Sequence, residues 1–346
     1  MHSMPAKAIN YGDLSRELLT ALRGERRSRP GFSRHLGYKS NIAQRWETGL
    51  CAPTATQFFH VCERLRLDVA ASIARFLRNE PGWLGRAPLS SGEGLAAFLN
   101  EVRGNSRIGE IASQLGHNRY GVARWFRGTA VPRLPDLLAL LDACTGRCLD
   151  FVGSFVDVEQ LPSVSARAGR LRQARELAYE HPLSHAVLRA LELERAGDGT
   201  SDEAFVARRV GIGEPEVEHY LKLLQRAGQL HRTRTGALRA EQSVVDTGGD
   251  PERARSLKLA WAKLAVARLE SGAPGHCGYR VFAIGKRELL RLREIELAYV
   301  REMQQVIASS EHNDSVGLYC AQLLDLGVAE ENAFPLPRGR RTSARL

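Results

Sequence analysis

The sequence predicts a mainly α-helical protein in which one helical unit occurs twice, and three observations support this. A segment beginning at Leu36-Gly37 returns without a gap at Leu115-Gly116, a spacing of 79 residues. Apolar residues recur every three or four positions over most of the chain, which is the period of an amphipathic helix. Short alternating segments that favour strands occur only after residue 228. The predicted fold class is therefore mainly α, with tandem four- or five-helix units, then a winged-helix-like unit and a small α/β region.

The two copies share the same pattern of glycine, tryptophan and proline. The first reads Leu36-Gly37 … Arg45-Trp46-x-x-Gly49-x-x-x-Pro53, and the second reads Leu115-Gly116 … Arg124-Trp125-x-x-Gly128-x-x-x-Pro132. Each predicts a helix, a tight glycine turn, a second helix and a loop that ends at proline. This is the outline of a helix-turn-helix. Two copies in one basic chain favour duplex DNA as the partner over catalysis.

The composition is that of an ordinary soluble protein. The chain has 346 residues, of which 43% are apolar and 25% charged, enough for roughly two or three domains with hydrophobic cores. No window resembles a membrane span, and the N-terminus lacks the apolar core of a secretory signal. The six cysteines form no CxxC pair, which suits a reducing compartment. We expect a cytoplasmic, nucleoid-associated bacterial protein.

The positive charge is concentrated in the half that holds the repeat. Residues 1–155 contain 21 Lys and Arg against 13 Asp and Glu, a net charge of +8 out of the total of +10. Arginine supplies nearly all of it, and guanidinium groups suit phosphate oxygens and guanine edges. A polyanion partner is the simplest explanation. A general arginine richness, as in many high-GC bacterial proteins, is the alternative.

The first helix-turn-helix unit is expected over residues 1–80. Ser28 is a good N-cap for a short second helix, and Gly37 suits the left-handed position after it. The third helix is expected over residues 39–48 and ends at Gly49. The segment Leu36-Gly37-x-x-x-Asn41-x-x-x-Arg45-Trp46-Glu47-x-Gly49-x-x-x-Pro53 resembles the XRE class of phage-repressor-type helix-turn-helix regulators.

The resemblance implies roles for particular residues. In that class the third helix lies in the major groove and reads bases from its first exposed positions and from one a turn further on. The matching base-reading positions are Ser40, Asn41 and Arg45, with Gln44 beside them. Asn can pair with adenine and Arg with guanine through two hydrogen bonds each. The implied phosphate contacts are Arg29, Lys39 and Thr48. A four-helix unit that serves only as a dimerisation or scaffold element is the alternative.

The second unit, expected over residues 92–158, is predicted to be a weaker reader. Its exposed third-helix positions are Arg119, Tyr120 and Arg124, and Arg107 and Arg127 are its phosphate candidates. Phe126 replaces the glutamate found in the first copy. This unit either reads bases as well or stacks on the first copy and sets the spacing between them. Tandem units could reach successive turns of one groove or pair with those of a second subunit.

The remaining chain divides into a helical connector and two further units. Residues 159–180 are charged and helix-prone. Residues 181–245 predict three helices and a hairpin, a winged-helix outline. Its would-be reading helix opens with Glu214, Glu216 and Glu218, and carboxylates face phosphate unfavourably. We therefore expect a packing or protein-contact domain there, with DNA reading as the alternative.

Residues 250–337 predict two long helices, 251–271 and 286–309, and two strands, 279–284 and 316–323. This strand–helix–strand pattern, with Phe334-Pro335-Leu336 near the end of the chain, is similar to a domain of unknown function that bacteria fuse to helix-turn-helix modules. The resemblance spans roughly residues 180–337. The second helix carries an apolar stripe that favours a homodimer through the C-terminal half, although a monomer core would explain it equally well. A basic tail, residues 338–346, ends the chain.

No catalytic or metal-binding pattern stands out, so we expect neither an enzyme nor a cofactor. Cys144 and Cys148 lie four apart on one helix, and buried cysteines explain them better than a metal site. The expected function is sequence-specific binding of double-stranded DNA by a transcriptional regulator. The first alternative is an antitoxin-like scaffold that uses the same units for protein contact. The second, single-stranded nucleic-acid binding, needs exposed stacking aromatics, and only Tyr38 and Tyr120 are candidates.

Overall fold

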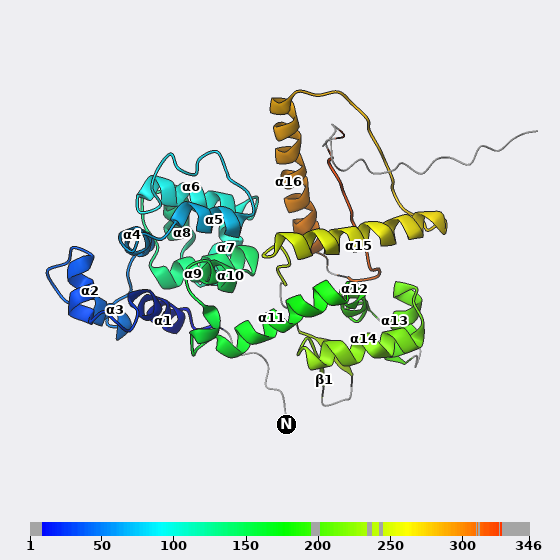
Figure 1. Cartoon of the computed structure of the whole chain (residues 1–346), viewed down its shortest axis with the longest axis horizontal. Coiled ribbons are helices and arrows are strands. Elements are labelled where there is room, and N and C mark those ends of the chain that lie inside the picture. Colours follow the sequence, from blue (N-terminus) through cyan, green and yellow to red (C-terminus); the bar gives the residue numbers. More distant parts are fainter. Residues whose placement is uncertain are drawn as a thin grey trace, which may run out of the picture.

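The computed structural model confirms the mainly helical class, with one small two-stranded sheet (Figure 1). It describes residues 9–194, 201–233, 237–241, 245–308, 310, 312–324 and 326. The expected basic tail at 338–346 and the end of the expected α/β region lie outside the described residues. In the described part of the chain, no helix is long and apolar enough to span a bilayer.

The repeat seen in the sequence is a repeat of five helices. The first copy consists of α1 (Tyr11–Arg23), α2 (Arg29–His35), α3 (Ile42–Glu47), α4 (Ala55–Arg64) and α5 (Val69–Leu77). The second consists of α6 (Gly92–Arg103), α7 (Ile108–Leu115), α8 (Arg119–Phe126), α9 (Leu134–Thr145) and α10 (Cys148–Gly153). Shifting the first set by the repeat spacing places each helix on its counterpart in the second. We refer to α1–α5 as the first repeat and α6–α10 as the second repeat.

Local sequence signals fix where these helices begin and end. Ser28 caps α2 by accepting a hydrogen bond from the backbone N–H of Gly31, and Thr54 caps α4 in a capping box with Gln57. The glycines expected after the second helix of each copy, Gly37 and Gly116, have φ values of +87° and +64°. This left-handed conformation costs glycine little and other residues more.

The two repeats contact each other through equivalent residues. The backbone N–H of Ala55 donates to Pro132 O at 2.9 Å, and that of Leu134 donates to Pro53 O at 2.8 Å. Pro53 and Pro132 are repeat equivalents, as are Ala55 and Leu134. The exchange is therefore reciprocal and has local two-fold character. Around it, α1 packs on α9, α6 packs on α4, and α5 packs on α10.

One hydrophobic core runs through both repeats. It extends from Leu14 to Val164 and contains a set of aromatic rings in mutual contact. Phe151 lies at its centre, with ring centroids 5.3 to 6.4 Å from those of Phe58, Phe59, Phe76, Phe98 and Phe155. Such contacts are worth about 0.5–1.5 kcal/mol each beyond area burial. The repeats thus form one packed body.

A second core lies in the C-terminal half. A short 3₁₀ helix (Val158–Gln160) leads into α11 (Ser165–Glu180), the expected connector, which runs to α12 (Leu183–Ala190), α13 (Asp202–Val210) and α14 (Glu214–Arg226). The expected hairpin is present: β1 (Leu230–Arg232) pairs antiparallel with β2 (Leu238–Ala240). Then come α15 (Pro251–Glu270) and α16 (Lys286–Ala308), close to their predicted bounds.

The prediction of a small α/β region beyond residue 250 is wrong for the described residues. Residues 279–284 and 316–323 form no strand. Their apolar side chains are largely exposed; Tyr279 and Val281, for example, are 85% and 80% accessible. A strand needs a neighbouring strand for its backbone hydrogen bonds, and alternation alone does not supply one.

Candidate nucleic-acid interface

The α2–α3 unit presents one side of α3 to solvent because its other side is anchored. Trp46 and Ala43 are buried behind the helix. The Trp46 ring meets Tyr38 edge-on at 5.7 Å, and the Tyr38 hydroxyl accepts a hydrogen bond from Gln57 Nε2. Since Gln57 also caps α4, these contacts fix α3 relative to α4.

Five of the residues expected to contact DNA in the first repeat are exposed on this outer side. They are Lys39, Ser40, Gln44, Arg45 and Thr48. Within the described chain the guanidinium of Arg45 makes no ion pair, so its donors remain available. The Thr48 hydroxyl donates to Gln44 O at 2.7 Å and can still accept a bond. No segment of the described chain covers this surface.

Asn41 is placed differently from the expectation of a freely projecting base reader. It is half-buried and precedes α3 as its N-cap: its Oδ1 accepts from the backbone N–H of Gln44 and from the Ser33 hydroxyl, both at 3.3 Å. Its Nδ2 donates to Gln44 Oε1 at 2.9 Å. The helix therefore begins at Ile42 and not at Lys39. The Asn41 side chain thus orients the side-chain amide of Gln44. Of these two residues, Gln44 is the one exposed to solvent.

Arg29 also has a structural partner that the sequence pattern did not reveal. Its Nε donates to Glu47 Oε2 at 2.7 Å, and Arg23 Nε donates to the other carboxylate oxygen at 2.7 Å. The Glu47 side chain is only 2% exposed, so two arginines compensate its burial. Arg29 thus ties the start of α2 to the end of α3, although 46% of its side chain remains accessible.

The second repeat builds a similar surface with different chemistry. Its α8 begins earlier than α3 does, because Asn118 accepts a bond from the Tyr120 backbone N–H at 2.8 Å and caps the helix. Tyr120, the counterpart of Asn41, is therefore on the helix and 79% exposed. The neighbouring basic side chains are also exposed: Arg107, Arg119, Arg124 and Arg127.

Some of these second-repeat arginines already have partners. Arg107 pairs with Glu110 at 3.7 Å on the surface, and such exposed pairs are weak. Arg127 Nε donates to Ala123 O at 3.3 Å, and Arg124 Nη2 donates to Thr129 O at 3.4 Å. Arg119 has no such contact within the described chain.

The anchoring of α8 also matches that of α3. His117 replaces Tyr38 and packs edge-on against Trp125 at 5.2 Å, and its Nε2 lies 3.1 Å from Asp136, the counterpart of Gln57. Where the first repeat has the buried Glu47, the second has Phe126, and the guanidinium of Arg103 stacks over its ring at 5.2 Å. The second repeat thus has a cation–π contact at the position where the first repeat has the ion pairs of Glu47.

Helix α14, the third helix of the segment 181–245 for which a winged-helix outline was expected, offers no comparable basic surface. Glu214 and Glu216 occupy the first turn of α14, and Glu218 pairs with Lys222 one turn later at 2.6 Å. These carboxylates are exposed. The first turn of α14 therefore presents carboxylates to solvent, as the sequence indicated.

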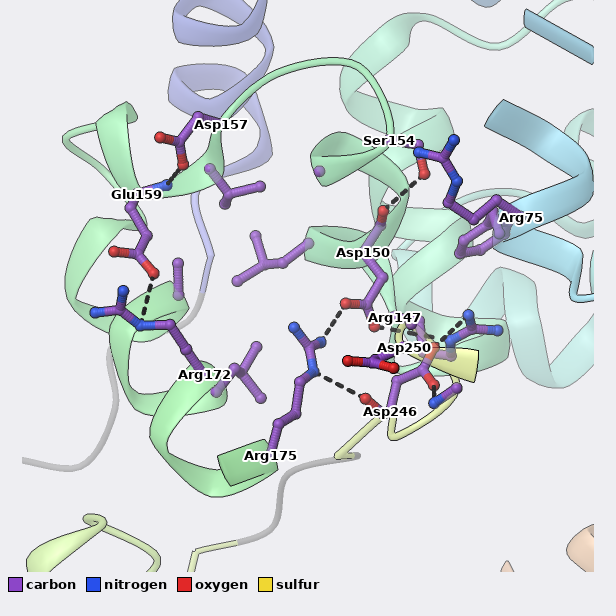
Figure 2. Close-up of a pocket in the computed structure, with 18 of the residues that line it drawn as sticks. Arg75, Arg147, Asp150, Ser154, Asp157, Glu159, Arg172, Arg175, Asp246 and Asp250 are labelled. Atoms are coloured by element: carbon purple, nitrogen blue, oxygen red, sulfur yellow. Dashed lines mark hydrogen bonds and ion pairs between the residues drawn. The ribbon is translucent and has the colours of Figure 1, made fainter. Parts of the chain in front are cut away.

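A pocket of about 480 Å³ lies where the repeats meet the C-terminal half (Figure 2). Its lining includes six arginines and six carboxylates. Figure 2 shows Arg175, on α11, directed towards Asp150 and towards the backbone of Asp246. Asp246 itself pairs with Arg78, which follows α5, and with Arg147, which precedes α10. The loop at Asp246 thus links the C-terminal half to both repeats.

This junction was not predicted from the sequence. The Asp246 side chain is 6% exposed and also accepts from the Gly248 backbone N–H at 2.8 Å. Burial, with Arg78 and Arg175 nearby, lowers the pKa of Arg147 to about 10, and its guanidinium stacks over Phe76 at 4.8 Å. The signal available in the sequence was only an acidic residue before Gly248-Gly249, which is common in loops.

The cysteine pair noted in the sequence lies in the core of the second repeat. Cys148 is buried and Cys144 is partly buried. Burial raises the pKa of the Cys148 thiol well above its ordinary range and that of Cys144 to about 11. Neutral, buried thiols of this kind pack as small apolar groups. Among the described residues, no cluster of three potential ligands is arranged to hold a metal.

The comparisons with known proteins bear on the C-terminal half only. Residues 166–323 match a family described as a domain of unknown function, DUF4423. The match begins in α11 and ends beyond α16. It covers less than half of the chain, and both repeats lie before it. It overlaps the region whose sequence pattern is similar to such a domain. No curated protein and no solved structure matches the chain.

Proposed function

We propose that this protein is a sequence-specific double-stranded DNA-binding regulator of transcription. The observation that carries the proposal is the outer surface of α3, where Gln44 and Arg45 are exposed on a helix that Trp46 anchors from behind. Arg can read guanine and Gln can read adenine in the major groove through paired hydrogen bonds. The two repeats act as helix-turn-helix modules, α2–α3 and α7–α8.

The electrostatics of the repeats support the same proposal. The net charge of +8 lies in residues 1–155, and basic side chains border both reading helices. Lys39 contacts phosphate beside α3, and Arg107 and Arg127 do so beside α8. Arg29 contributes indirectly, because its ion pair with Glu47 holds α2 and α3 together. The second repeat has Ala123 where the first has Gln44, so the two modules prefer different bases.

The experiment is selection of binding sites from a random pool of duplex DNA with the full chain, followed by affinity measurements over a salt series. We expect one recurring sequence and an affinity that falls steeply with salt, because phosphate contacts release counterions. Retention of no DNA at low salt would contradict the proposal and favour the alternative, a protein-interaction scaffold. Preference for single strands over duplex would contradict it as well.

A further inference from the structure

The C-terminal region exposes most of the apolar surface of the described chain. All exposed large apolar side chains except Leu50 and Tyr120 lie between Leu259 and Leu326. Helix α16 is the extreme case, since none of its described side chains is buried. Figure 1 shows α16 standing away from the two packed bodies. Monomeric proteins rarely leave a large continuous apolar patch in water, so this region has the character of an interface.

The apolar side chains of α16 form one continuous stripe. Leu289, Leu292, Ile295, Tyr299 and Met303 follow one another at intervals of three or four residues and therefore share a face. Ile295 and Tyr299 are 56% and 51% exposed. The ring of Tyr319 lies 5.8 Å from that of Tyr299, yet both rings remain about half accessible. Leu289, Leu292 and Met303 are partly buried, and none of the five is fully buried. The chain's own contacts thus cover the stripe only in part along a helix about 34 Å long.

Charge is segregated along the same helix. Residues 286–293 contain four basic residues and one acidic residue, whereas residues 294–308 contain three acidic residues and one basic residue. Two such helices side by side attract each other when antiparallel, because each basic half then faces an acidic half. In a parallel pair, like charges would face each other and weaken the association. The pattern is complementary to itself, which singles out a second copy of this chain as the partner.

We propose that α16 pairs antiparallel with α16 of a second copy, through the stripe. Arg291 and Glu302 are eleven residues apart, about three helical turns, so they border the same edge of the stripe. Both are exposed, and neither has an ion pair within the described chain. In an antiparallel pair the same edges of the two helices meet. Arg291 then lies within about one turn of Glu302 of the partner subunit, and the contact occurs twice.

The interface goes beyond the proposed DNA binding and does not depend on it. A dimer joined at α16 carries four repeats, two in each chain. If each chain engages DNA, the second chain binds at a raised effective concentration.

Sedimentation velocity of the full chain over a wide concentration range tests the interface. We expect a dimer, and we expect Ile295→Glu to raise its dissociation constant at least tenfold because it places a charge in the stripe. The matched control is Leu290→Glu. Leu290 is equally exposed, at 57%, but lies on the opposite side of α16, so this variant should stay dimeric. Helical content by circular dichroism should be the same in all three proteins.

The orientation is tested by charge exchange. Arg291→Glu and Glu302→Arg should each weaken the dimer, and the double variant should restore it, because each exchanged residue again faces an opposite charge. A wild-type chain that is monomeric at all concentrations overturns the proposal. So does a dimer that responds equally to Leu290→Glu and Ile295→Glu. A double variant weaker than both single variants overturns the antiparallel arrangement.

Discussion

Thr54 and Arg133 form an antiparallel bridge across the contact between the repeats, and they occupy the same position in their two copies. Two hydrogen bonds flank the bridge, from Ala55 N–H to Pro132 O at 2.9 Å and from Leu134 N–H to Pro53 O at 2.8 Å, and the repeat relates one to the other. In each copy the bridging residue is the N-cap of the fourth helix of the repeat, α4 or α9, on which α3 or α8 is anchored. The bridge thereby fixes α3 relative to α8 within a single chain.

This local two-fold leads to the first prediction. If the repeats read DNA, the preferred site should contain two unequal half-sites in inverted orientation, because two-fold protein contacts are mirrored in the DNA dyad. Arg45→Gln should relax base preference in one half-site and Arg124→Gln in the other. Binding-site selection with each variant checks this. A site built as a direct repeat, or one in which both variants affect the same bases, would contradict it.

The shared core leads to a second prediction. A fragment of residues 9–80 should fail to fold, because it separates Phe58, Phe59 and Phe76 from Phe151 and Phe98. A fragment of residues 9–164, which keeps the whole first core, should unfold cooperatively. Urea denaturation followed by circular dichroism and tryptophan fluorescence distinguishes the two. A cooperative transition in the short fragment would show that the first repeat is an independent domain.

The junction at Asp246 leads to a third prediction. Asp246→Asn removes the carboxylate that compensates Arg78 and Arg147. Breaking a buried ion pair by removing one partner costs ~3–5 kcal/mol. We expect a loss of that order in the free energy of unfolding, measured in urea.

Glu110→Gln is the matched control for this junction, since it breaks an exposed pair with Arg107. Exposed pairs contribute about 0–1 kcal/mol, so the control should unfold almost as the wild type does. Equal stability of the Asp246 and Glu110 variants would show that the junction contributes little to the fold.

A fourth prediction concerns pH. Burial lowers the pKa of His185, and Arg189 lowers it further. The unfolded chain, with a histidine pKa of about 6.5, therefore binds the proton first as pH falls. The stability contribution is present above that pH and is lost below it. Unfolding free energies measured from neutral to mildly acidic pH should decline, and His185→Gln should decline less.

The measured quantity is the difference in unfolding free energy between wild type and His185→Gln at each pH. The contributions of the other titrating groups are the same in both proteins and cancel in this difference. The hydrogen bond to Glu194 raises the pKa of His312, so that histidine acts in the opposite direction. Because it is present in both proteins, its effect cancels. Identical pH profiles for wild type and His185→Gln would contradict the assigned role of His185.

The helices of the repeats were predictable because their signals are local. Gly37 and Gly116 take the left-handed conformation that their place after a helix requires, and Ser28 and Thr54 act as caps through their own side chains. The bounds of α15 and α16 follow from apolar spacing in the same way. Such signals need no knowledge of distant residues.

What could not be predicted depends on which side chains meet in the folded chain. Asn41 matches an exposed position in the motif, yet Ser33 and Gln44 engage both ends of its amide. Arg29 looks like a phosphate ligand until the buried Glu47 is placed beside it. Residues 279–284 alternate as a strand would, but no neighbouring strand of the described chain pairs with them. Spacing along the chain does not encode these contacts.

The most direct measurement of the central claim compares Arg45→Ala with Lys39→Ala on the selected duplex and on single-base variants of it. We expect Arg45→Ala to cost ~1–3 kcal/mol on the preferred site and to remove discrimination at one base pair. Lys39→Ala should weaken binding to all the sequences alike and leave their ranking unchanged. If Arg45→Ala leaves base discrimination intact, α3 is not the helix that reads DNA, and the proposed function is contradicted.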